Sequence, residues 1–450
     1  MTVSDLALII LAAGKGTRMK SSLHKVLHPL GGRPMLHHLI DTAAPLNPSR
    51  KVIVVGAGKE QVEASVGDKA DIVVQEPQLG TGHAVQVTKE QLADFKGDVL
   101  ILYGDVPLLS QATMQKMVDT RADTGAAVVV LGFTPADAKA YGRLKVNENG
   151  NLDAIVEYKD ATEKERAITL CNSGIMSLDG NHMFTLLDAL DNDNAAGEYY
   201  LTDVVEIANS KGLGCAVVEA DEQEVMGVNS RSELAEAEAV FQASRRQFFM
   251  DEGVTLTDPT SVYFSHDTKI GADVSIAPNV VFGPGVEIAA NVTINAFCHL
   301  EGAKVGEGSS IGPFARLRPA ADLGKDVKVG NFVEIKKATV EDGAKVSHLS
   351  YIGDARIGKN ANIGAGTITC NYDGYFKYHT DIGEGAFIGS NSALVAPVAI
   401  GDGAIVGAGS VVTMAVEGDA LAVARGKQRE LGDWAAKFRS KQQEKKKNQG

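Results

Sequence analysis

The sequence has few cysteines, and they lie far apart. No CxxC pair is found among the four cysteines, Cys171, Cys215, Cys298 and Cys370. Most thiolate zinc sites and redox-active cysteine pairs use that spacing. A disulfide framework is therefore disfavoured, and we expect free thiols in a reducing compartment.

Long apolar runs are missing as well. No stretch approaches the ~18–20 apolar residues that cross a bilayer, so we expect no membrane span. The N-terminus resembles no secretory signal, because Asp5 stands where a positive charge belongs and Gly14-Lys15-Gly16 interrupts the apolar stretch from Leu6 to Ala13. We therefore expect a cytoplasmic protein.

Basic residues are in the minority, with 44 Lys and Arg against 57 Asp and Glu and a net charge of −13. This balance disfavours nucleic acid as a partner. Residues 425–450 are the exception, because nine basic and three acidic side chains give this segment a charge of +6. Most such tails are solvated, but this one also suits a polyanionic small molecule.

Glycine is abundant, at 48 of 450 residues against a usual share of about 7%. Many glycines follow a repeat that begins at Ile270, in which an apolar residue recurs every six positions with occasional steps of five. The repeat positions are Ile270, Ile276, Phe282, Ile288, Ile294, Leu300, Val305, Ile311, Leu317, Leu323, Val329, Ile335, Val340, Val346, Ile352, Ile357, Ile363, Ile382, Ile388, Leu394, Ile400, Val406 and Val412.

A hexapeptide repeat predicts a parallel β-solenoid, with one short strand and one turn in each hexad. The apolar residue points inward, and glycine takes turn conformations that a side chain would disfavour. Three hexads make a coil of 18 residues, so 270–412 accommodates roughly eight coils. The segment Cys370–His379 breaks the repeat, and we expect an extruded loop there.

Residues 1–230 instead alternate apolar runs with helical patterns. Such alternation predicts an α/β Rossmann-like domain with a largely parallel sheet. The expected strands are Leu8–Leu11, Val52–Val55, Ile72–Val74, Val99–Tyr103 and Ala127–Leu131, with helices from Pro34 to Ile40 and from Ser110 to Ala122. The predicted boundaries are 1–230 for this domain, 231–252 for a linker helix capped by Ser232, 253–424 for the solenoid domain and 425–450 for the basic tail.

Two motifs of the first domain point to a nucleotide. Leu11–Met19 is a glycine-rich loop after the first strand, with Lys15 and Arg18 inside it and Lys25 just beyond. Cations beside such a loop suit a nucleoside triphosphate whose pyrophosphate leaves. Asp105 follows another strand, and a carboxylate at a strand end suits Mg²⁺.

These motifs carry a resemblance. LAAGKGTRM (11–19), QLGTGHA (78–84) and LYGDVPL (102–108) are similar to the sugar-nucleotide pyrophosphorylase family. Joined to NFVEIKK (331–337), HLSYIGDA (348–355) and NIGAGTITCNYDG (362–374), they closely resemble bacterial bifunctional uridyltransferase/acetyltransferases. The resemblance covers about residues 3–430 and implies a Rossmann-like nucleotidyltransferase domain, a left-handed parallel β-helix and a homotrimer.

The resemblance implies two consecutive reactions: acetyl transfer from acetyl-CoA to glucosamine-1-phosphate, then uridylyl transfer from UTP to N-acetylglucosamine-1-phosphate with release of pyrophosphate. It implies Mg²⁺ at Asp105 and Asn229. The residues implied for UTP or the UDP-sugar are Leu11, Ala12, Ala13, Gly14, Arg18, Lys25, Gln75, Gly80, Thr81, Tyr103, Gly104, Asp105, Gly142, Glu157, Asn172 and Asn229. One departure is His24, which stands where the family usually has proline.

Acetyl transfer to an amine needs a general base, and His348 has a suitable intrinsic pKa. Arg318 and Lys336 lie one 18-residue coil apart, and with Tyr351 they are expected to stack into a cationic cleft. Glu334 is a candidate to orient this site. By resemblance, His348 is the catalytic base and Arg318, Lys336, Tyr351 and Asn362 bind glucosamine-1-phosphate. Acetyl-CoA is assigned to Ala365, Asn371, Tyr372, Ser390, Ala408 and Arg425.

Two other functions fit the same domain pair. One is a non-catalytic regulatory or exchange-factor subunit, which would be expected to lose Lys25, Asp105 or His348. The other is a monofunctional pyrophosphorylase whose solenoid only oligomerises, and the set Arg318, Lys336, His348 and Tyr351 argues against it.

Overall fold

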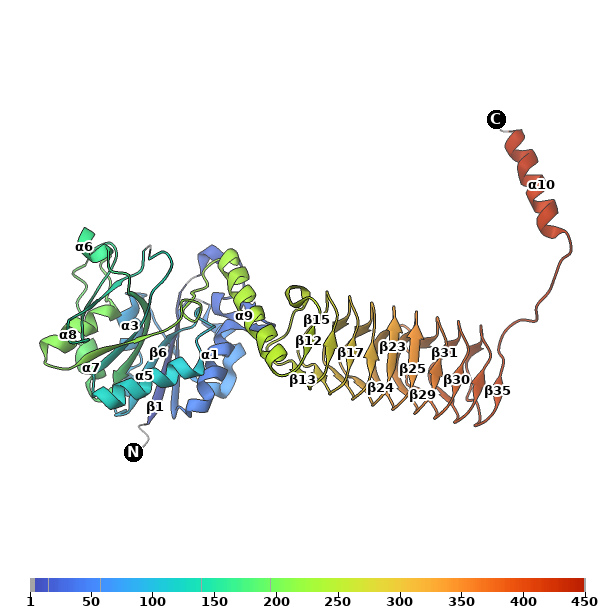
Figure 1. Cartoon of the computed structure of the whole chain (residues 1–450), viewed down its shortest axis with the longest axis horizontal. Coiled ribbons are helices and arrows are strands. Elements are labelled where there is room, and N and C mark those ends of the chain that lie inside the picture. Colours follow the sequence, from blue (N-terminus) through green and yellow to red (C-terminus); the bar gives the residue numbers. More distant parts are fainter. Residues whose placement is uncertain (1–4, 15, 57, 139, 195, 449–450) are drawn as a thin grey trace. The chain divides into compact units, whose positions relative to one another are not determined.

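The computed structural model describes residues 5–14, 16–56, 58–138, 140–194 and 196–448. It divides the chain into two compact units, Met1–Arg245 and Arg246–Gly450. Helix α9 (Arg231–Asp251) spans this division (Figure 1). The expected helix is confirmed, but it begins one residue before the predicted cap Ser232.

The first unit is built on a mostly parallel sheet with the order β11-β7-β10-β6-β1-β4-β5. The strands are β1 (Leu6–Ala12), β4 (Arg50–Val55), β5 (Asp71–Val74), β6 (Asp98–Tyr103), β7 (Val128–Phe133), β10 (Cys171–Asp179) and β11 (Cys215–Glu219), with β8 (Arg143–Val146) and β9 (Leu152–Val156) as a hairpin beside β10 and β2 (Pro29–Leu30) and β3 (Arg33–Pro34) as a separate small pair. Strand β10 runs antiparallel to β6 and β7.

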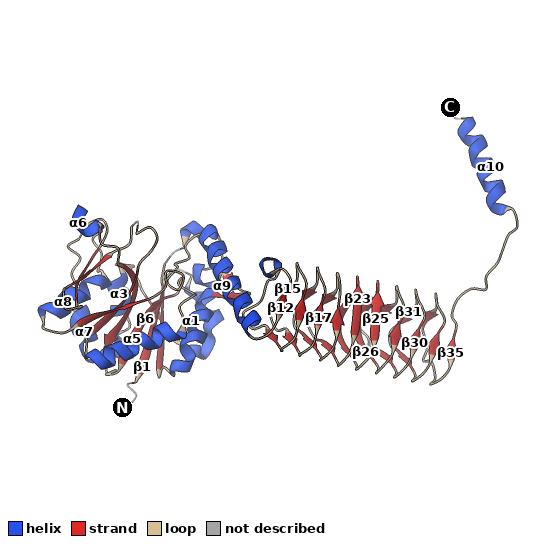
Figure 2. Cartoon of the chain, viewed as in Figure 1, coloured by secondary structure: helices blue, strands red, loops and turns tan. Residues whose placement is uncertain are grey.

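Helices cover both faces of this sheet (Figure 2). On one face the core includes side chains from α3 (Thr81–Gln86), α7 (Gly180–Leu187) and α8 (Val204–Ser210). On the other it includes side chains from α1 (Met35–Ala43), α2 (Lys59–Val66) and α5 (Gln111–Thr124). Two shorter helices are α4 (Lys89–Leu92) and α6 (Glu163–Arg166). Because helices bury both faces, every residue of β1 is buried and the strand is apolar throughout.

The expected strands and helices of this unit are confirmed, with β7 shifted by one or two residues from the predicted run. Ser110 caps α5 as predicted, since its hydroxyl accepts a hydrogen bond from the backbone N–H of Thr113. Strands β8 to β11 were not expected. In β10, Ser173 and Gly174 interrupt the apolar pattern, and β8, β9 and β11 are short.

The second unit is a parallel β-helix whose strands form three ladders (Figure 1). Ladder A contains β12 (Thr255–Leu256), β14 (Ser275–Ile276), β17 (Thr293–Ile294), β20 (Ser310–Ile311), β23 (Lys328–Asn331), β25 (Lys345–His348), β27 (Asn362–Ile363), β30 (Phe387–Ile388), β33 (Ile405–Val406) and β35 (Leu421–Ala422).

Ladder B contains β15 (Val281–Phe282), β18 (His299–Leu300), β21 (Arg316–Leu317), the first part of β24 (Glu334–Val340) and of β26 (Tyr351–Ile357), β28 (Ile368–Cys370), β31 (Ala393–Val395) and β34 (Val411–Val412). Ladder C contains β13 (Lys269–Ile270), β16 (Glu287–Ile288), β19 (Ala303–Val305), β22 (Ala321–Leu323), the second part of β24 and β26, β29 (Thr380–Ile382) and β32 (Val398–Ile400).

The repeat positions form the core of this solenoid. Ile270 is partly buried, and every other predicted inward residue is at most 4% exposed. The strand register pairs Ile270 with Ile288 and Ile276 with Ile294, so equivalent hexads stack directly. The segment between β28 and β29 leaves the coils as the expected extruded loop, with Tyr375 and Phe376 largely exposed.

Glycine plays the predicted part in the solenoid and also a second one. Some of the left-handed turn positions are taken by glycine, such as Gly308 and Gly343, and others by residues such as Asn291. The glycine after an inward residue has the second role, because it allows neighbouring coils to approach. A Cβ on Gly306 would collide with the carbonyl oxygen of Gly324 in the next coil.

The basic C-terminal segment ends in α10 (Trp434–Lys447), which has no buried residues. Its Trp434 and Phe438 rings stack with centroids 5.3 Å apart. No helix in the described part of the chain is both long and apolar enough to span a bilayer. All four cysteines are free, as expected.

The coil contacts predict that Gly306→Ala destabilises the solenoid by about 1–3 kcal/mol, because the added methyl group meets immovable backbone. Denaturant unfolding of the full chain measures the change. The matched control is Gly432→Ala, since a Cβ at that position meets no atom within 4 Å. Equal stability of the two variants would contradict this role of the glycine.

Candidate functional site

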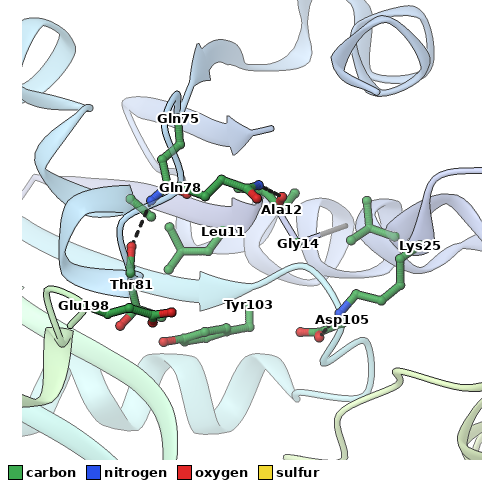
Figure 3. Close-up of a pocket in the computed structure, with 14 residues that line it drawn as sticks. Leu11, Ala12, Gly14, Lys25, Gln75, Gln78, Thr81, Tyr103, Asp105 and Glu198 are labelled. Atoms are coloured by element: carbon green, nitrogen blue, oxygen red, sulfur yellow. Dashed lines mark hydrogen bonds and ion pairs between the residues drawn. The ribbon is translucent and has the colours of Figure 1, made fainter. Parts of the chain in front are cut away.

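A cavity of about 470 Å³ opens where β1 and β6 end (Figure 3). The two strands are parallel neighbours with Leu11 paired to Tyr103, so the loops that follow them meet at one edge of the sheet. The lining residues are Leu11, Ala12, Ala13, Gly14, Lys25, Val26, Gln75, Gln78, Gly80, Thr81, Ala84, Tyr103, Asp105 and Glu198. Most residues predicted for the nucleotide are therefore brought together.

The glycine-rich loop lines one side of this cavity and leaves space in it, because its glycines have no side chains. Gly14 has no side chain, and a Cβ there would meet the ammonium nitrogen of Lys25 at 3.9 Å. Gly16 has φ +58° and packs closely on the Lys25 side chain. Lys15 lies outside the described residues.

Three polar side chains converge at the end of β6. The ammonium group of Lys25 forms an ion pair with Asp105 and donates a hydrogen bond to Oδ1 of Asn229 at 3.2 Å. The Asn229 segment is held in place, since the Val228 N–H donates to the Asp105 carbonyl oxygen and Oε2 of Glu233 accepts from the Asn229 N–H. The Asp105 carboxylate and the Asn229 amide oxygen thus both contact the Lys25 ammonium group. Oxygen donors of this kind are the ligands that Mg²⁺ prefers.

The segment before Lys25 is anchored by one side chain of α2. The Gln61 carboxamide donates to the Ser22 carbonyl oxygen and accepts from the His24 N–H, both at 2.9 Å. A proline at this position, as the resemblance led us to expect, would have no N–H to donate. His24 is buried, and burial is the first cause that lowers the pKa of its imidazole.

The opposite wall of the cavity is held by two glutamines (Figure 3). Gln75 donates to the Gly80 carbonyl oxygen at 2.9 Å, and Gln78 donates to that of Ala13. Gln78 was not predicted as a site residue, although it lies in the motif that carries the resemblance. Through it, the QLGTGHA segment and the glycine-rich loop are tied together.

A second cavity of about 600 Å³ adjoins the first and shares Thr81, Tyr103 and Glu198 with it. Gly142, Glu157 and Asn172 line it, as expected for the sugar subsite. The structure adds residues that sequence reasoning missed: Ala140, Tyr141, Tyr158, Lys159, Ser173, Gly174, Tyr200 and Thr202. No motif pointed to them, because they come from the segments that flank the β8–β9 hairpin, from β10 and from the segment before α8.

The pKa values of two carboxyl groups in and near this second cavity are raised. Burial, and then the charge of Asp160, raises the pKa of Glu157. Burial, with Glu206 as the next cause, raises the pKa of Asp203 to about 6. Burial also raises the pKa of the Tyr103 phenol, which stays protonated and able to donate a hydrogen bond.

Three predicted residues line neither cavity. Arg18 is exposed on a short 3₁₀ turn. Gly104 packs behind the first cavity, where a Cβ would meet Val26 at 3.0 Å. Asn229 is joined to the site by its hydrogen bond to Lys25.

In the solenoid, Arg318 and Lys336 stack as expected, since the Arg318 N–H donates to the Ile335 carbonyl oxygen across the coils. The Arg318 guanidinium pairs with Glu334 at 2.8 Å, so Glu334 does orient it. Lys377, from the extruded loop, lies against Lys336. Its ammonium group is the main cause that lowers the pKa of Lys336, followed by the charge of Arg318. Lys377 was missed because it follows no repeat.

Tyr351 is placed differently from the expectation. It pairs in register with Glu334, and Gly353 is the residue opposite Lys336. The Tyr351 ring folds over Gly353, where a Cβ would meet the Tyr351 ring and hydroxyl group. Its hydroxyl lies 3.5 Å from Nδ2 of Asn371, and that amide donates to Asp354 at 2.5 Å.

His348 ends β25 on ladder A, with Val346 inward and the imidazole exposed as predicted. Its Nδ1 lies 2.7 Å from Oδ1 of Asn331. A cavity of about 350 Å³ beside it is walled by Phe314 and Phe332, and its lining contains neither Arg318 nor Lys336. His348 and Tyr351 flank the corner between ladders A and B.

The remaining predicted residues follow that corner along the solenoid. Asn362 pairs with Lys345 on ladder A. Ala365, Ser390 and Ala408 occupy equivalent turns, because the N–H of Asn391 donates to Ala365 and that of Gly409 to Ser390. Arg425 donates to the Ala408 carbonyl oxygen at 2.5 Å, and Tyr372 donates to the Gly374 carbonyl oxygen in the extruded loop.

Known families match both units. The MobA-like NTP transferase domain matches residues 8–151. The bacterial transferase hexapeptide (six repeats) matches residues 267–302, and the hexapeptide repeat of succinyl-transferase matches residues 380–414.

Relatives match along nearly the whole chain, and each carries the name bifunctional protein GlmU. One from Paramagnetospirillum magneticum is 58% identical over 447 residues, covering 99% of both chains. One from Rhodospirillum rubrum is 60% identical over 439 residues, covering 97% of this chain and 98% of the relative. One from Rhizorhabdus wittichii is 60% identical over 441 residues, covering 98% of both.

The fold and its two sites define a transferase that joins a Rossmann-like nucleotidyltransferase domain to a left-handed β-helix of hexapeptide repeats. The chain belongs to the GlmU family of bifunctional enzymes, with uridyltransferase and acetyltransferase activities. The regulatory-subunit and monofunctional alternatives are thereby set aside.

The Gln61 contacts predict a specific effect on nucleotide handling. Gln61→Leu removes two hydrogen bonds worth about 0.5–1.5 kcal/mol each, so the Lys25 segment loosens and kcat/KM for UTP falls roughly tenfold. Steady-state kinetics of uridylyl transfer measures this, with acetyl transfer as the internal reference. The control is Gln115→Leu on α5, whose exposed amide donates to Asp119 on the same helix. An unchanged kcat/KM in Gln61→Leu would refute the anchoring role.

Proposed function

We propose that the cavity at the ends of β1 and β6 carries uridylyl transfer from UTP to N-acetylglucosamine-1-phosphate. The observation that carries this is the convergence of Lys25, Asp105 and Asn229 beside the glycine-rich loop. Leu11, Ala12, Ala13 and Gly14 line the triphosphate path, Gln75, Gly80 and Thr81 contact the uracil, and the second cavity holds the sugar through Gly142, Glu157 and Asn172.

The oxygen donors at this site fit Mg²⁺. Asp105 and Asn229 supply one carboxylate and one amide oxygen, and Mg²⁺ typically takes one or two carboxylates together with substrate phosphates and water. No cluster of three or more His, Cys, Asp or Glu residues competes for a metal within the described ranges. When bound, the ion would neutralise charge on the phosphates.

The chain's own residues then orient the reactants. Lys25 lines the cavity and would be available to a substrate phosphate if Asp105 held the metal ion. The attacking sugar phosphate is already ionised near neutral pH, so the reaction needs positioning and positive charge rather than a protein base. Tyr103, which lines both cavities, contacts the nucleotide sugar, and Gly104 behind it supports this wall. Arg18, exposed on its 3₁₀ turn, is assigned to a phosphate.

We propose that the solenoid carries acetyl transfer from acetyl-CoA to glucosamine-1-phosphate. Arg318, Lys336, Lys377, Tyr351 and Asn362 bind the sugar phosphate, with three cations for its charge. His348 removes the proton from the amine. Ala365, Ser390 and Ala408 stack along one corner of the solenoid. We therefore assign acetyl-CoA to this corner, with the binding residues Ala365, Asn371, Tyr372, Ser390, Ala408 and Arg425.

We propose further that the protein acts as a homotrimer in the cytoplasm, where UTP and acetyl-CoA are used, with residues 1–230 and 253–424 as its two catalytic domains. In support of assembly, Phe297, Phe314 and Phe332 form an exposed stack, with ring centroids 4.9 and 5.2 Å apart. Leu349 follows at the equivalent turn of the next coil. Contiguous exposed apolar side chains are typical of an interface.

Chelation separates the two reactions. Removal of Mg²⁺ with EDTA should abolish uridylyl transfer and leave acetyl transfer unchanged, because Asp105 and Asn229 at the first site are the proposed ligands of the ion. Parallel assays with UTP and with acetyl-CoA measure this, and restored Mg²⁺ serves as the control. Equal loss of both activities would contradict the assignment.

Substitution separates the sites in both directions. His348→Ala should lower acetyl transfer by about 10²–10⁴-fold and leave uridylyl transfer intact, whereas Asp105→Ala should do the reverse. Mass spectrometry measures each reaction in a separate incubation, one with glucosamine-1-phosphate and acetyl-CoA and the other with N-acetylglucosamine-1-phosphate, UTP and Mg²⁺. Loss of both activities in either folded variant would overturn the two-site assignment.

A further inference from the structure

The imidazole of His348 has one hydrogen-bond partner among the contacts of the described residues. That partner is Asn331, whose Oδ1 lies 2.7 Å from Nδ1. The two residues are neighbours in ladder A, because β23 and β25 pair in parallel with Asn331 opposite His348. A residue 17 positions earlier in the sequence thus sets the direction of the ring.

The backbone around this pair is held from several sides. The Leu349 N–H donates to the Asn331 carbonyl oxygen at 3.0 Å. The His348 carbonyl oxygen accepts from the Ser350 hydroxyl at 2.8 Å and from the Gly366 N–H at 3.2 Å. Because neighbouring coils hold both ends of the contact, the ring and the amide meet in one defined geometry.

An amide oxygen has lone pairs and no proton, so the Nδ1 that faces it must carry the hydrogen. The other ring nitrogen, Nε2, then keeps its lone pair. The geometry points to a role for this contact, and we propose that Asn331 is a positioning residue that fixes the Nδ1–H tautomer of His348. Nε2 is thereby left free to take the proton from the amine of the acetyl acceptor.

The neutrality of Asn331 matters as much as its geometry. A base that works near neutral pH must be unprotonated there, and a carboxylate beside Nδ1 would favour the imidazolium form. Lys328 is the charged side chain among the described residues that line the adjoining cavity with His348. An amide therefore orients the ring without adding a charge that would hold the proton.

This inference rests on the proposed role of His348 as the general base. Two variants of Asn331 test it in the full-length enzyme. Asn331→Leu removes the acceptor, so kcat for acetyl transfer should fall at least about tenfold, while the KM values for acetyl-CoA and glucosamine-1-phosphate and the rate of uridylyl transfer remain unchanged.

Asn331→Asp keeps an acceptor oxygen and adds a negative charge. It should keep most of the activity at high pH, and the acid limb of its kcat–pH profile should move up by about one pH unit, because the carboxylate raises the pKa of His348. A purely structural role for Asn331 would not produce this shift. Thr293→Ala, an exposed outward residue of β17 on the same ladder, is the matched control.

Thermal unfolding confirms that each variant is folded. A wild-type kcat in Asn331→Leu, or an unshifted acid limb in Asn331→Asp, would overturn the positioning role while His348→Ala remains inactive. If His348→Ala itself retained full acetyl transfer, the base assignment would fail first, and the two failures are thus distinguishable.

Discussion

Both units depend on parallel strand pairing in exact register. In the first unit, pairing of Leu11 with Tyr103 brings the glycine-rich loop and Asp105 to one sheet edge, although they are some 90 positions apart in the sequence. In the second, the same kind of pairing sets Asn331 opposite His348 and Arg318 beside Lys336. Because register aligns the ends and turns of strands, it also aligns the functional side chains that follow them.

This arrangement places cations where phosphates are to bind, in a chain whose net charge is −13. Lys25 stands at the end of the first sheet with an ion pair to Asp105. Lys336 and Lys377 stand together on the solenoid, and their mutual repulsion is visible in the lowered pKa of Lys336. Like charges held close by the fold favour a phosphate over water, since the anion relieves the repulsion.

Much of the fold was readable because its patterns are local. The hexad period predicted the solenoid and its inward residues, and those residues are buried as expected. The apolar runs predicted the central parallel strands. Strand β10 was not predicted, because its apolar pattern is interrupted and its partners β6 and β7 lie far back along the chain. The β8–β9 hairpin was not predicted, because its strands are short and partly polar. The prediction that coil glycines take turn conformations holds for residues such as Gly308, but the need for Gly306 in the close approach of the next coil was not predicted.

The two domains, the glycine-rich loop and the residues Lys25, Asp105 and His348 could all be predicted from the sequence alone. The reason is that each of them belongs to a repeat or lies in or beside a motif. Tertiary structure alone decided the contacts that orient them. Gln61 anchors the segment before Lys25, Lys377 returns to Lys336, and Asn331 faces His348. These partners carry no pattern of their own, because what selects them is their position across a coil or a loop rather than their neighbours in the chain.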